Sequence, residues 1–360
     1  MQFERNTKSK SEGLKAPKSV YEIGAPKHPV HEIKSLVKQH YDIDGLLVPL
    51  DGERDQNFLV DAGGARRWVV KVSSDAAGIA NADYQAALLS HLEETALHLP
   101  LPRNVASKHG ENYIAHRFKN GQSGAVRLIT YLEGRPFSVQ KHRRDAWAGR
   151  IGAFQGRLCR ALHGFHHVGA TAFMPWNSSS KEMFNRETLA YLEMDIGSLV
   201  APHLDRLRSY SLPALQEMRS QVVHNDIHPG NVLMDDRGQI SGIIDFGDAI
   251  RAPIIQELAV SATSLIEFSP TKHRGLIAEL IEGFCSECPL FSDELALLHD
   301  AILLRSILSV ALGRVKDGCA PPAQRPHPAS KASEVGLRAI LSLDDNAPWA
   351  PRLVCRFANG

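Results

Sequence analysis

The spacing of hydrophobic residues changes near residue 135, and this change predicts two regions with different secondary structure. Before that point, the short apolar runs LLVPL, NFLVDA and RRWVVKVS alternate with polar turns, which is typical of β-hairpins. ENYIAHRF and GAVRLITYLEG predict two further strands. Helical spacing predicts helices at Val30–Tyr41 and Ala82–Leu99. We therefore expect a small unit with about five strands and one or two helices.

Beyond residue 135 the spacing is helical, with one interruption. Apolar residues line one side of RDAWAGRIGAFQGRLCRALHGFHH, and further helices are predicted within residues 181–207, 254–268, 271–288, 292–316 and 330–343. The interruption, VLMDDRGQISGIIDFGD, predicts a strand, a tight turn and a second strand. The expected fold class is α+β, with a β-rich N-terminal lobe (28–134) and a larger, mostly helical C-terminal lobe (135–345). We expect a flexible leader at 1–27, a surface loop at PPAQRPHP and a tail at 346–360.

Composition narrows the class of protein. The 360 residues include 41 Lys and Arg against 40 Asp and Glu, so no overall positive field attracts nucleic acid or an anionic membrane. The charged N-terminus lacks the apolar core of a secretory signal, and we find no run of eighteen or more uninterrupted apolar residues. The 5 cysteines argue against a disulfide framework. These features predict a cytoplasmic protein without nucleic-acid or membrane partners, and they leave its oligomeric state open.

The stretch HNDIHPGN, His224–Asn231, places a carboxylate and an amide just before the predicted hairpin. DFG follows at the end of that hairpin, so Asp226, Asn231 and Asp245 should converge at one end of it. Oxygen ligands of this kind suit a hard cation such as Mg²⁺. Protein kinases use D-x-x-x-x-N followed by DFG for a catalytic carboxylate and two metal ligands. Alone, the octapeptide could equally be a polar turn.

A kinase reading also requires a phosphate-binding lysine on a strand ahead of a helix. WVVKVS supplies Lys71 on the third predicted strand, before the helix predicted at Ala82–Leu99. An isolated lysine in an edge strand would be unremarkable, but this position meets the requirement. Lys71 therefore strengthens the kinase interpretation of the motif.

HNDIHPGN and IIDFGD together resemble the aminoglycoside phosphotransferase and choline kinase superfamily, whose usual motif is H-G-D-x-x-x-x-N. LDGERDQNFLV, the KVSS strand, ISGIIDFGD and QELAVSAT most resemble hydroxylysine kinase and related kinase domains fused to class III aminotransferases. The resemblance extends over about residues 30–345. It implies a protein-kinase-like two-lobe fold and a kinase that phosphorylates small molecules.

The resemblance also implies roles for residues at matching positions. Asp226 matches the catalytic base or substrate-orienting carboxylate, and Asn231 and Asp245 match the Mg²⁺ ligands. Lys71 matches the residue that contacts the phosphates of the nucleotide, which is ATP or GTP. The implied partners are that nucleotide and a small hydroxylated amine.

Further positions are implied for nucleotide binding and for support of the catalytic loop. A polar turn between the first two strands would close over the phosphates, and the connection between the lobes would meet the purine. His224 and Glu257 would brace the catalytic loop. The nucleotide-binding candidates are Glu53, Arg54, Asp55, Gln56 and Asn57 in the turn, and Thr130, Tyr131 and Leu132 in the connection.

Two positions depart from the family pattern. Asn225 replaces the glycine of H-G-D, a change that asparagine tolerates because it enters left-handed conformations more readily than most residues. Gln85 takes the place of the glutamate that usually pairs with the lysine, with Asp83, Glu93 and Glu94 in poorer register. A glutamine can hydrogen-bond the lysine without pairing its charge, and the sequence leaves open whether Gln85 is the partner of Lys71. We assign no role to His228.

The acceptor is less determined than the reaction. An ammonium group would require carboxylates, for which Asp248, Asp195 and Glu267 are candidates. Any of them could equally be a surface charge or a helix cap, and that reading comes first for Asp195 and Glu267. A hydroxylysine-like amine is the first choice. An aminoglycoside, as in antibiotic resistance, is the second, followed by choline or ethanolamine and homoserine.

Two other classes of protein compete with a small-molecule kinase. A pseudokinase scaffold would lose the metal ligands, whereas the full set is present in this sequence. A protein-serine kinase would need an activation segment after DFG. Here AIRAPIIQELAV leads almost directly into a helix, which favours a small acceptor.

Overall fold

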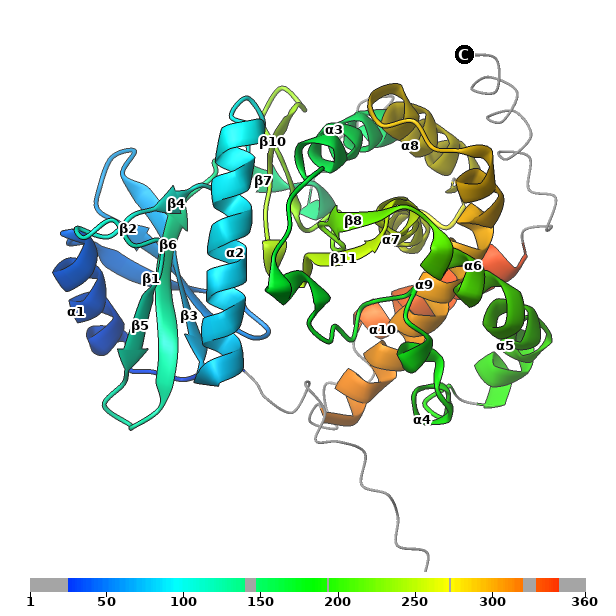
Figure 1. Cartoon of the computed structure of the whole chain (residues 1–360), viewed down its shortest axis with the longest axis horizontal. Helices are drawn as coiled ribbons and strands as arrows, with labels where there is room; N and C mark the ends of the chain where they lie inside the picture. The colour runs from blue at the N-terminus through cyan, green and yellow to red at the C-terminus, as the bar shows by residue number, and fades with distance from the viewer. Residues whose placement is uncertain (1–24, 140–146, 193, 272, 320–327, 343–360) are drawn as a thin grey trace, which may run out of the picture.

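The computed structural model describes residues 25–139, 147–192, 194–271, 273–319 and 328–342, which form two lobes (Figure 1). A β-sheet with flanking helices forms the N-lobe, and helices dominate the C-lobe, so the α+β prediction is confirmed. The predicted tail lies outside the described residues, as do most of the predicted leader and of the loop PPAQRPHP.

The N-lobe sheet has six antiparallel strands in the order β1-β2-β3-β6-β4, with β5 also paired to β6. It thus has one strand more than expected, because the two-residue β4 is too short to give a period. The elements of this lobe are α1 (Val30–Tyr41), β1 (Leu46–Leu50), β2 (Gln56–Asp61), β3 (Arg67–Ser74), α2 (Asp75–Thr95), β4 (Asn104–Val105), β5 (Ile114–Arg117) and β6 (Ser123–Thr130).

Helix α2 begins at Asp75, earlier than the predicted Ala82, and it ends at Thr95 rather than Leu99. The Asp75 carboxylate accepts a hydrogen bond from the Gly78 N–H at 2.9 Å, which satisfies one of the free donors of the first turn. Gly78 weakens helical propensity at that point, which is why the sequence pattern places the start too late.

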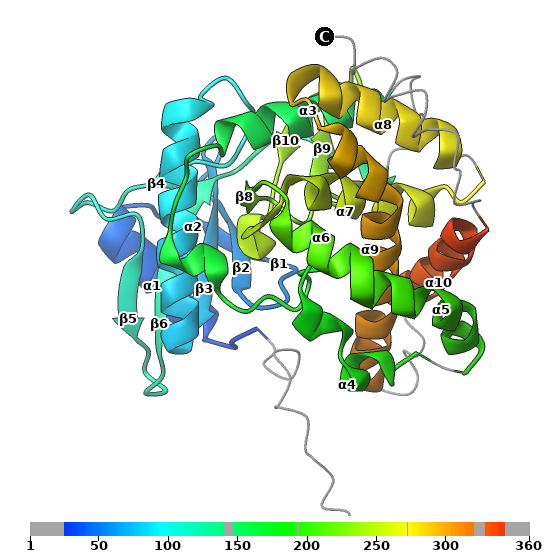
Figure 2. The ribbon, with the colours of Figure 1, turned by 45° about the vertical axis from the view of Figure 1, so that its right-hand side comes forward.

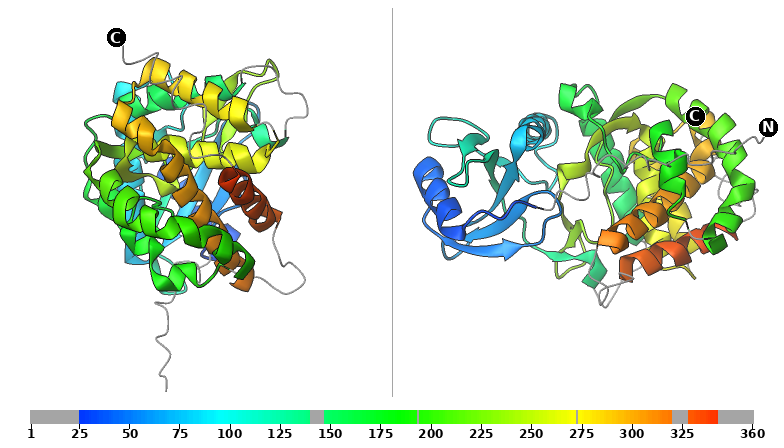
Figure 3. Two further views of the ribbon diagram at one scale, coloured as in Figure 1. Left: turned by 90° about the vertical axis from the view of Figure 1, so that its right-hand side faces the viewer. Right: turned by 90° about the horizontal axis from the view of Figure 1, so that it is seen from below.

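The two N-lobe helices cover opposite sides of the sheet (Figures 1 and 3). Ile33 and Val37 of α1 are buried in one core cluster with Phe58 and Leu128 of the sheet. Leu88 and Leu92 of α2 instead belong to the core cluster of the C-lobe. Each fully buried leucine contributes about 2 kcal/mol through loss of apolar surface from water. Because these leucines are buried against C-lobe residues, α2 helps to join the lobes.

The C-lobe packs its helices around two small antiparallel sheets, one with three strands in the order β10-β9-β7 and one with two, β11 and β8. Helices α3 and α8 lie side by side (Figure 2), and they approach so closely that a Cβ at Gly152 would clash with the Leu280 carbonyl. The elements are β7 (Arg135–Pro136), α3 (Trp147–Ala161), α4 (Arg186–Leu189), α5 (Met194–Arg206), α6 (Leu212–Glu217), β8 (Ser220–Val223), β9 (Val232–Met234), β10 (Ile240–Ile243), β11 (Ile250–Pro253), α7 (Ile254–Phe268), α8 (His273–Glu287), α9 (Ser292–Cys319) and α10 (Pro328–Leu341).

Helix α9 is long and apolar enough to cross a membrane by length and composition. However, 83% of its most apolar 18-residue window is buried inside the protein. Its hydrophobic residues therefore serve the core of the C-lobe, together with α7 and α10.

The two ribbons bring the motif residues together. The predicted hairpin forms as β9 and β10, and β11 pairs with β8 so that Ile250 lies opposite Val223. Residues 224–231 follow β8, and residues 244–249 precede β11. Because both ribbons are short and antiparallel, these two connecting segments are held beside each other at one end.

Candidate active site

Hydrogen bonds within residues 224–231 hold Asp226 against Asn231. The Asn231 Nδ2 donates to the Asp226 carboxylate at 2.8 Å and to the Asp226 carbonyl at 3.0 Å. The Ile244 N–H donates to the Asn231 carbonyl at 3.0 Å, which ties this loop to the residue before Asp245. The predicted convergence of Asp226, Asn231 and Asp245 is therefore present in the structure. Asn231 uses its amide N–H on Asp226 and leaves its Oδ1 available as a ligand atom.

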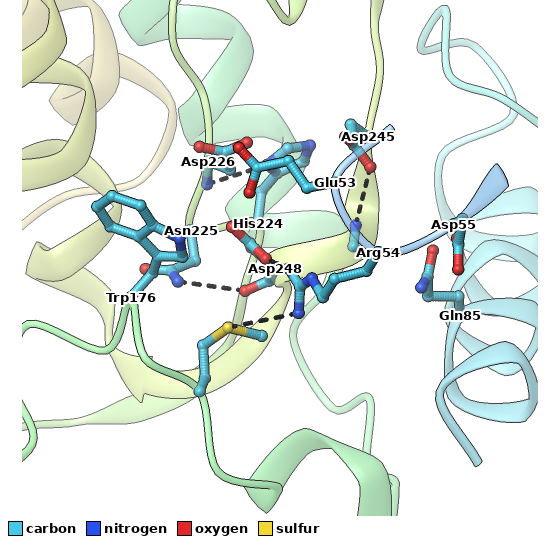
Figure 4. A network of polar contacts seen from close by, with 12 residues as sticks. Glu53, Arg54, Asp55, Gln85, Trp176, His224, Asn225, Asp226, Asp245 and Asp248 are labelled. Carbon is cyan, nitrogen blue, oxygen red and sulfur yellow. Dashed lines mark hydrogen bonds and ion pairs between the residues drawn. The ribbon is translucent and has the colours of Figure 1, made fainter. Parts of the chain in front are cut away.

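Lys71 of β3 reaches Asp245 across the lobes. Its Nζ lies 3.3 Å from Asp245 Oδ1 and 3.7 Å from Asp55 Oδ2. The Lys71 ammonium holds the pKa of Asp245 well below its usual range and outweighs the opposing effect of burial. Asp245 therefore stays ionised at neutral pH. Figure 4 shows Asp245 and Asp226 on the same side of this network, which is made by both lobes.

The chemistry of the donor set fits a hard divalent cation. Asp245 supplies an ionised, half-exposed carboxylate, and Asn231 supplies an amide oxygen that its Nδ2 contacts with Asp226 do not use. Among the described residues no cluster of three or more His, Cys, Asp or Glu could hold a metal. Magnesium commonly takes only one or two protein ligands and completes its shell with phosphate oxygens and water. Asn231 and Asp245 are sufficient for such a site.

Asp226 lies in a dry setting with two histidines nearby. Burial raises the pKa of the Asp226 carboxyl, while the positive charges of His228 and Arg305 oppose that rise. His228, to which the sequence assigned nothing, accepts the Gly230 N–H on Nδ1 at 3.1 Å and places Nε2 3.7 Å from the Asp226 carboxylate. The structure thus puts His228 directly beside the expected base.

His224 joins the two connecting segments, as the predicted supporting role requires. Its Nδ1 accepts the Asp226 N–H at 3.3 Å, and its Nε2 lies 3.2 Å from the Ile244 carbonyl. Burial lowers the pKa of His224 to about 4, so its ring is neutral at pH 7. A neutral ring donates from Nε2 to the carbonyl while Nδ1 accepts, which matches both contacts.

Asn225 contributes more than tolerance of an unusual backbone angle. Its φ is 65°, in the left-handed region that favours glycine. Its buried Nδ2 donates to the Asp248 carbonyl at 3.2 Å, and its Oδ1 accepts from Gln256 at 2.8 Å. The departure from H-G-D therefore links the catalytic loop to the residues after DFG and to α7.

Glu257 of α7 holds the loop at residues 224–231 through a hydrogen bond to its backbone. Its Oε2 accepts the Asn225 N–H at 2.9 Å, and Gln155 of α3 donates to its Oε1 at 3.4 Å. Burial raises the pKa of Glu257 to about 7, although these hydrogen bonds oppose the rise. Its place in the structure fits a bracing role, in which it acts through Asn225.

The structure gives Gln85 a hydrogen-bond partner other than Lys71. Gln85 Oε1 accepts instead from the Nη2 of Arg127, a buried residue that lies directly opposite Lys71 in the β3–β6 register. Burial lowers the pKa of the Arg127 guanidinium while Asp55 and Asp245 oppose that effect. The available signal for this contact was Arg127 itself, a charged residue at an inward position of the strand GAVRLIT. Which residue it pairs with cannot be read from one sequence.

The polar turn between β1 and β2 divides into two groups. Asp55 contacts Lys71, Arg54 forms an ion pair with Asp248, and Glu53 contacts Lys316 of α9 at 2.6 Å. Arg54 and Glu53 thus contact the C-lobe, whereas Asp55 contacts Lys71 within the N-lobe. The other two shape the lobe itself, since Gln56 exchanges two hydrogen bonds with the His28 backbone and Asn57 donates to the Asp51 carbonyl at 3.0 Å. The side chains of Gln56 and Asn57 are therefore engaged away from the cleft.

The predicted purine-edge residues lie where β6 ends and the chain enters the C-lobe. Thr130 Oγ1 accepts the Arg103 N–H at 2.9 Å, which fixes the end of the strand. Tyr131 carries Arg67 over its ring at 5.8 Å from the centroid. Leu132 packs against Gly242 of β10, on the C-lobe side. The connection is thus held at both ends, and its role toward a nucleotide stays a prediction.

Of the three acceptor candidates, only Asp248 lies in the network around Asp226 (Figure 4). Asp195 forms an exposed ion pair with Arg338 at 2.6 Å. Glu267 is covered by α10, where Ser333 hydrogen-bonds to its carboxyl and burial raises its pKa. Asp195 is thus a surface charge, as the alternative reading expected, whereas Glu267 is a buried carboxyl between α7 and α10.

Three further residues near Asp226 have no counterpart in the sequence motifs. Trp176 lies beside Asp226 and Asn225 (Figure 4), and Arg305 and Lys316 of α9 both approach its ring. They come from a loop and a long apolar helix, far from the motif in sequence. Nothing in their local patterns distinguishes them from surface or core residues.

Comparisons with known proteins agree with this fold. A hydroxylysine kinase from Xenopus laevis is 25% identical over 305 residues, which cover 78% of this chain and 80% of that protein. A solved microcompartment-associated aminopropanol kinase has a TM-score of 0.66 at 17% identity and covers 90% of this chain and 97% of its own. An amicoumacin kinase in complex with AMP-PNP, Ca²⁺ and Ami has a TM-score of 0.64 at 16% identity and covers 90% and 96%.

These two structures have the same overall fold as this chain. Residues 46–291, more than half of the sequence, match the phosphotransferase enzyme family. The chain belongs to this family, and it is a kinase of small molecules.

Proposed function

We propose that this kinase transfers the γ-phosphoryl group of ATP or GTP to a hydroxyl of a small amine-bearing metabolite, with a hydroxylysine-like amino acid as the first choice. The observation that carries the proposal is the contact between Lys71 and Asp245 beside the Asp226–Asn231 pair. These four side chains are the set that kinase chemistry requires. A pseudokinase scaffold would have no need to keep all of them.

Phosphoryl transfer requires positioning and neutralisation of charge more than covalent catalysis. Asp226 orients the acceptor hydroxyl toward the phosphorus and accepts its proton, and His224 holds the Asp226 backbone in place. Lys71, whose ammonium contacts Asp245, neutralises phosphate charge. Asn231 and Asp245 would hold Mg²⁺, which supplies charge stabilisation on the phosphate oxygens when bound.

The choice of nucleotide rests on resemblance. An amicoumacin kinase of the same fold was solved with AMP-PNP, which supports ATP as the first donor to test. The connection at Thr130–Leu132 carries no side chain that selects adenine over guanine by chemistry alone. GTP therefore belongs in every assay beside ATP.

The choice of acceptor has two supports. The relatives named hydroxylysine kinase match across most of this chain. In addition, Asp248 and Glu53 bring two carboxylates toward the space around Asp226, where an ammonium group needs a counter-charge (Figure 4). Aminoglycosides remain the second candidate because they also present hydroxyls next to ammonium groups.

A nucleotide-consumption screen tests the proposal. Purified protein is offered 5-hydroxylysine, aminoglycosides, choline, ethanolamine and homoserine, each with ATP and with GTP and Mg²⁺. We expect acceptor-dependent consumption with a hydroxylated amine and loss of at least a hundredfold in Asp226→Asn. The proposal would be refuted if none of the hydroxylated amines stimulated nucleotide consumption, or if Asp226→Asn were as active as the wild type.

A further inference from the structure

Two positively charged side chains of α9 approach the ring of Trp176. Lys316 Nζ lies 5.3 Å from the centroid of that ring, and Arg305 Cζ lies 4.8 Å from it. Arg305 also donates to the Trp176 carbonyl at 2.8 Å, which fixes the guanidinium beside the indole. Two cations from α9 are therefore presented next to one flat, partly exposed ring.

This group lies within reach of the reacting carboxylate. Arg305 is close enough to lower the pKa of Asp226, and Glu53 is close enough to raise it. Figure 4 shows Trp176 and Glu53 on opposite sides of Asp226. A small acceptor whose hydroxyl meets Asp226 would thus place its other groups against these residues.

A carboxylate from the protein itself already contacts Lys316. Glu53, at the tip of the β1–β2 turn, places Oε1 2.6 Å from Lys316 Nζ, although the two residues are 263 positions apart in sequence. The Glu53 side chain is 68% exposed and that of Lys316 is 37% exposed, so solvent and a ligand can reach the pair. An exposed ion pair of this kind contributes little stability, about 0–1 kcal/mol, and is readily exchanged.

We propose that Lys316, with Arg305 beside it, forms a subsite for the carboxylate of the acceptor, and that Glu53 occupies this subsite when no acceptor is bound. The inference rests on the proposed function and narrows it to hydroxylated amino acids. Such an acceptor carries both charges that the site complements, because Asp248 offers a carboxylate on the side of its ammonium. Amino-alcohols and aminoglycosides lack the carboxylate.

The chemistry of the pair supports exchange of Glu53 for a ligand. The carboxylates of Glu53 and Asp226 repel each other, as the effect of Glu53 on Asp226 shows. Nucleotide phosphates would add further negative charge beside this turn. A carboxylate on the acceptor would pair with Lys316 in place of Glu53. Glu53 could then move away from the negative charges of Asp226 and the phosphates.

The test measures binding by calorimetry in the presence of AMP-PNP and Mg²⁺, with 5-hydroxylysine and with its carboxamide as a matched probe. The carboxamide keeps the hydroxyl and both amines and loses only the negative charge. We expect the wild type to prefer hydroxylysine, and we expect Lys316→Gln to reduce that preference about tenfold or more, the usual effect of one charge-assisted hydrogen bond. Lys316→Arg should restore most of the preference.

Two further variants complete the design. Lys38→Gln removes a lysine that pairs with Asp44 on the far surface of the N-lobe, and it should leave the preference unchanged. Glu53→Gln removes the internal competitor, so it should tighten binding of hydroxylysine relative to the carboxamide. An unchanged preference in Lys316→Gln, or equal binding of both probes by the wild type, would overturn the subsite.

The outcome is separable from that of the proposed function. Turnover of hydroxylysine without dependence on its carboxylate would keep the kinase proposal and reject the subsite. Carboxylate-dependent binding without turnover of any hydroxylated amine would do the reverse.

Discussion

Replacing Asn225 by glycine restores the residue usual in the family motif, and we predict that it destabilises this protein. Asn225 is fully buried, with φ at 65°. Glycine would relieve the left-handed strain, worth about 1 kcal/mol. It would also leave the Asp248 carbonyl and the Gln256 amide without their partners, at a cost of about 1–3 kcal/mol each. The net expectation is a loss of about 1–5 kcal/mol in the free energy of unfolding.

Urea denaturation of wild type and Asn225→Gly measures this loss, and a double-mutant cycle with Gln256→Leu isolates its main contact. Because Gln256 donates directly to Asn225, we expect a coupling energy of about 1 kcal/mol between the two changes. Activity should fall as well, since the loop that carries Asp226 loses two anchors. Equal or greater stability of Asn225→Gly, or strict additivity in the cycle, would refute the reasoning.

Three more predictions follow from buried or charged groups. Burial raises the pKa of Glu257 in the folded protein from 4.5 to about 7. The folded state therefore binds this proton more tightly than the unfolded state, and the protein loses stability as the pH rises from about 4.5 to 7. Urea denaturation at the two ends of this window should show that Glu257→Gln removes about 3 kcal/mol of the loss. Lys71→Met should lower kcat/KM for the nucleotide on the order of a hundredfold in steady-state kinetics while the protein stays folded by circular dichroism. Gln85→Leu should lower the free energy of unfolding by about 1–3 kcal/mol. The double variant Gln85→Leu/Arg127→Met should lose less than the sum of the two single variants, because the guanidinium that needed a partner is gone. Strict additivity of the two changes in urea denaturation would contradict the contact.

The parts of this fold that sequence predicts are those written in local patterns. Val30–Tyr41 forms a helix because its apolar residues repeat at helical spacing, and the hairpin β9–β10 forms where alternation and turn residues require it. Asp226, Asn231 and Asp245 converge because that hairpin closes between them. Here the spacing in sequence determines the distance in space.

The parts that sequence misses depend on long-range partners. Arg127 lies opposite Lys71 and donates a hydrogen bond to Gln85 because β3 and β6 pair in one particular register, which no local pattern reveals. Glu53 meets Lys316 only after the two lobes come together. Asn225 departed from the motif, and its two new partners explain the change only once the segments around it are placed.

The central claim is that this constellation transfers a phosphoryl group to the hydroxyl of an amine-bearing acceptor. The most direct measurement incubates the protein with nucleotide, Mg²⁺ and 5-hydroxylysine and identifies the product by mass spectrometry and ³¹P NMR. We predict a phosphomonoester on the acceptor hydroxyl with the wild type, and none above background with Asp226→Asn or Asp245→Asn. No phosphomonoester from the wild type with any hydroxylated amine, or undiminished product from either variant, would contradict the account.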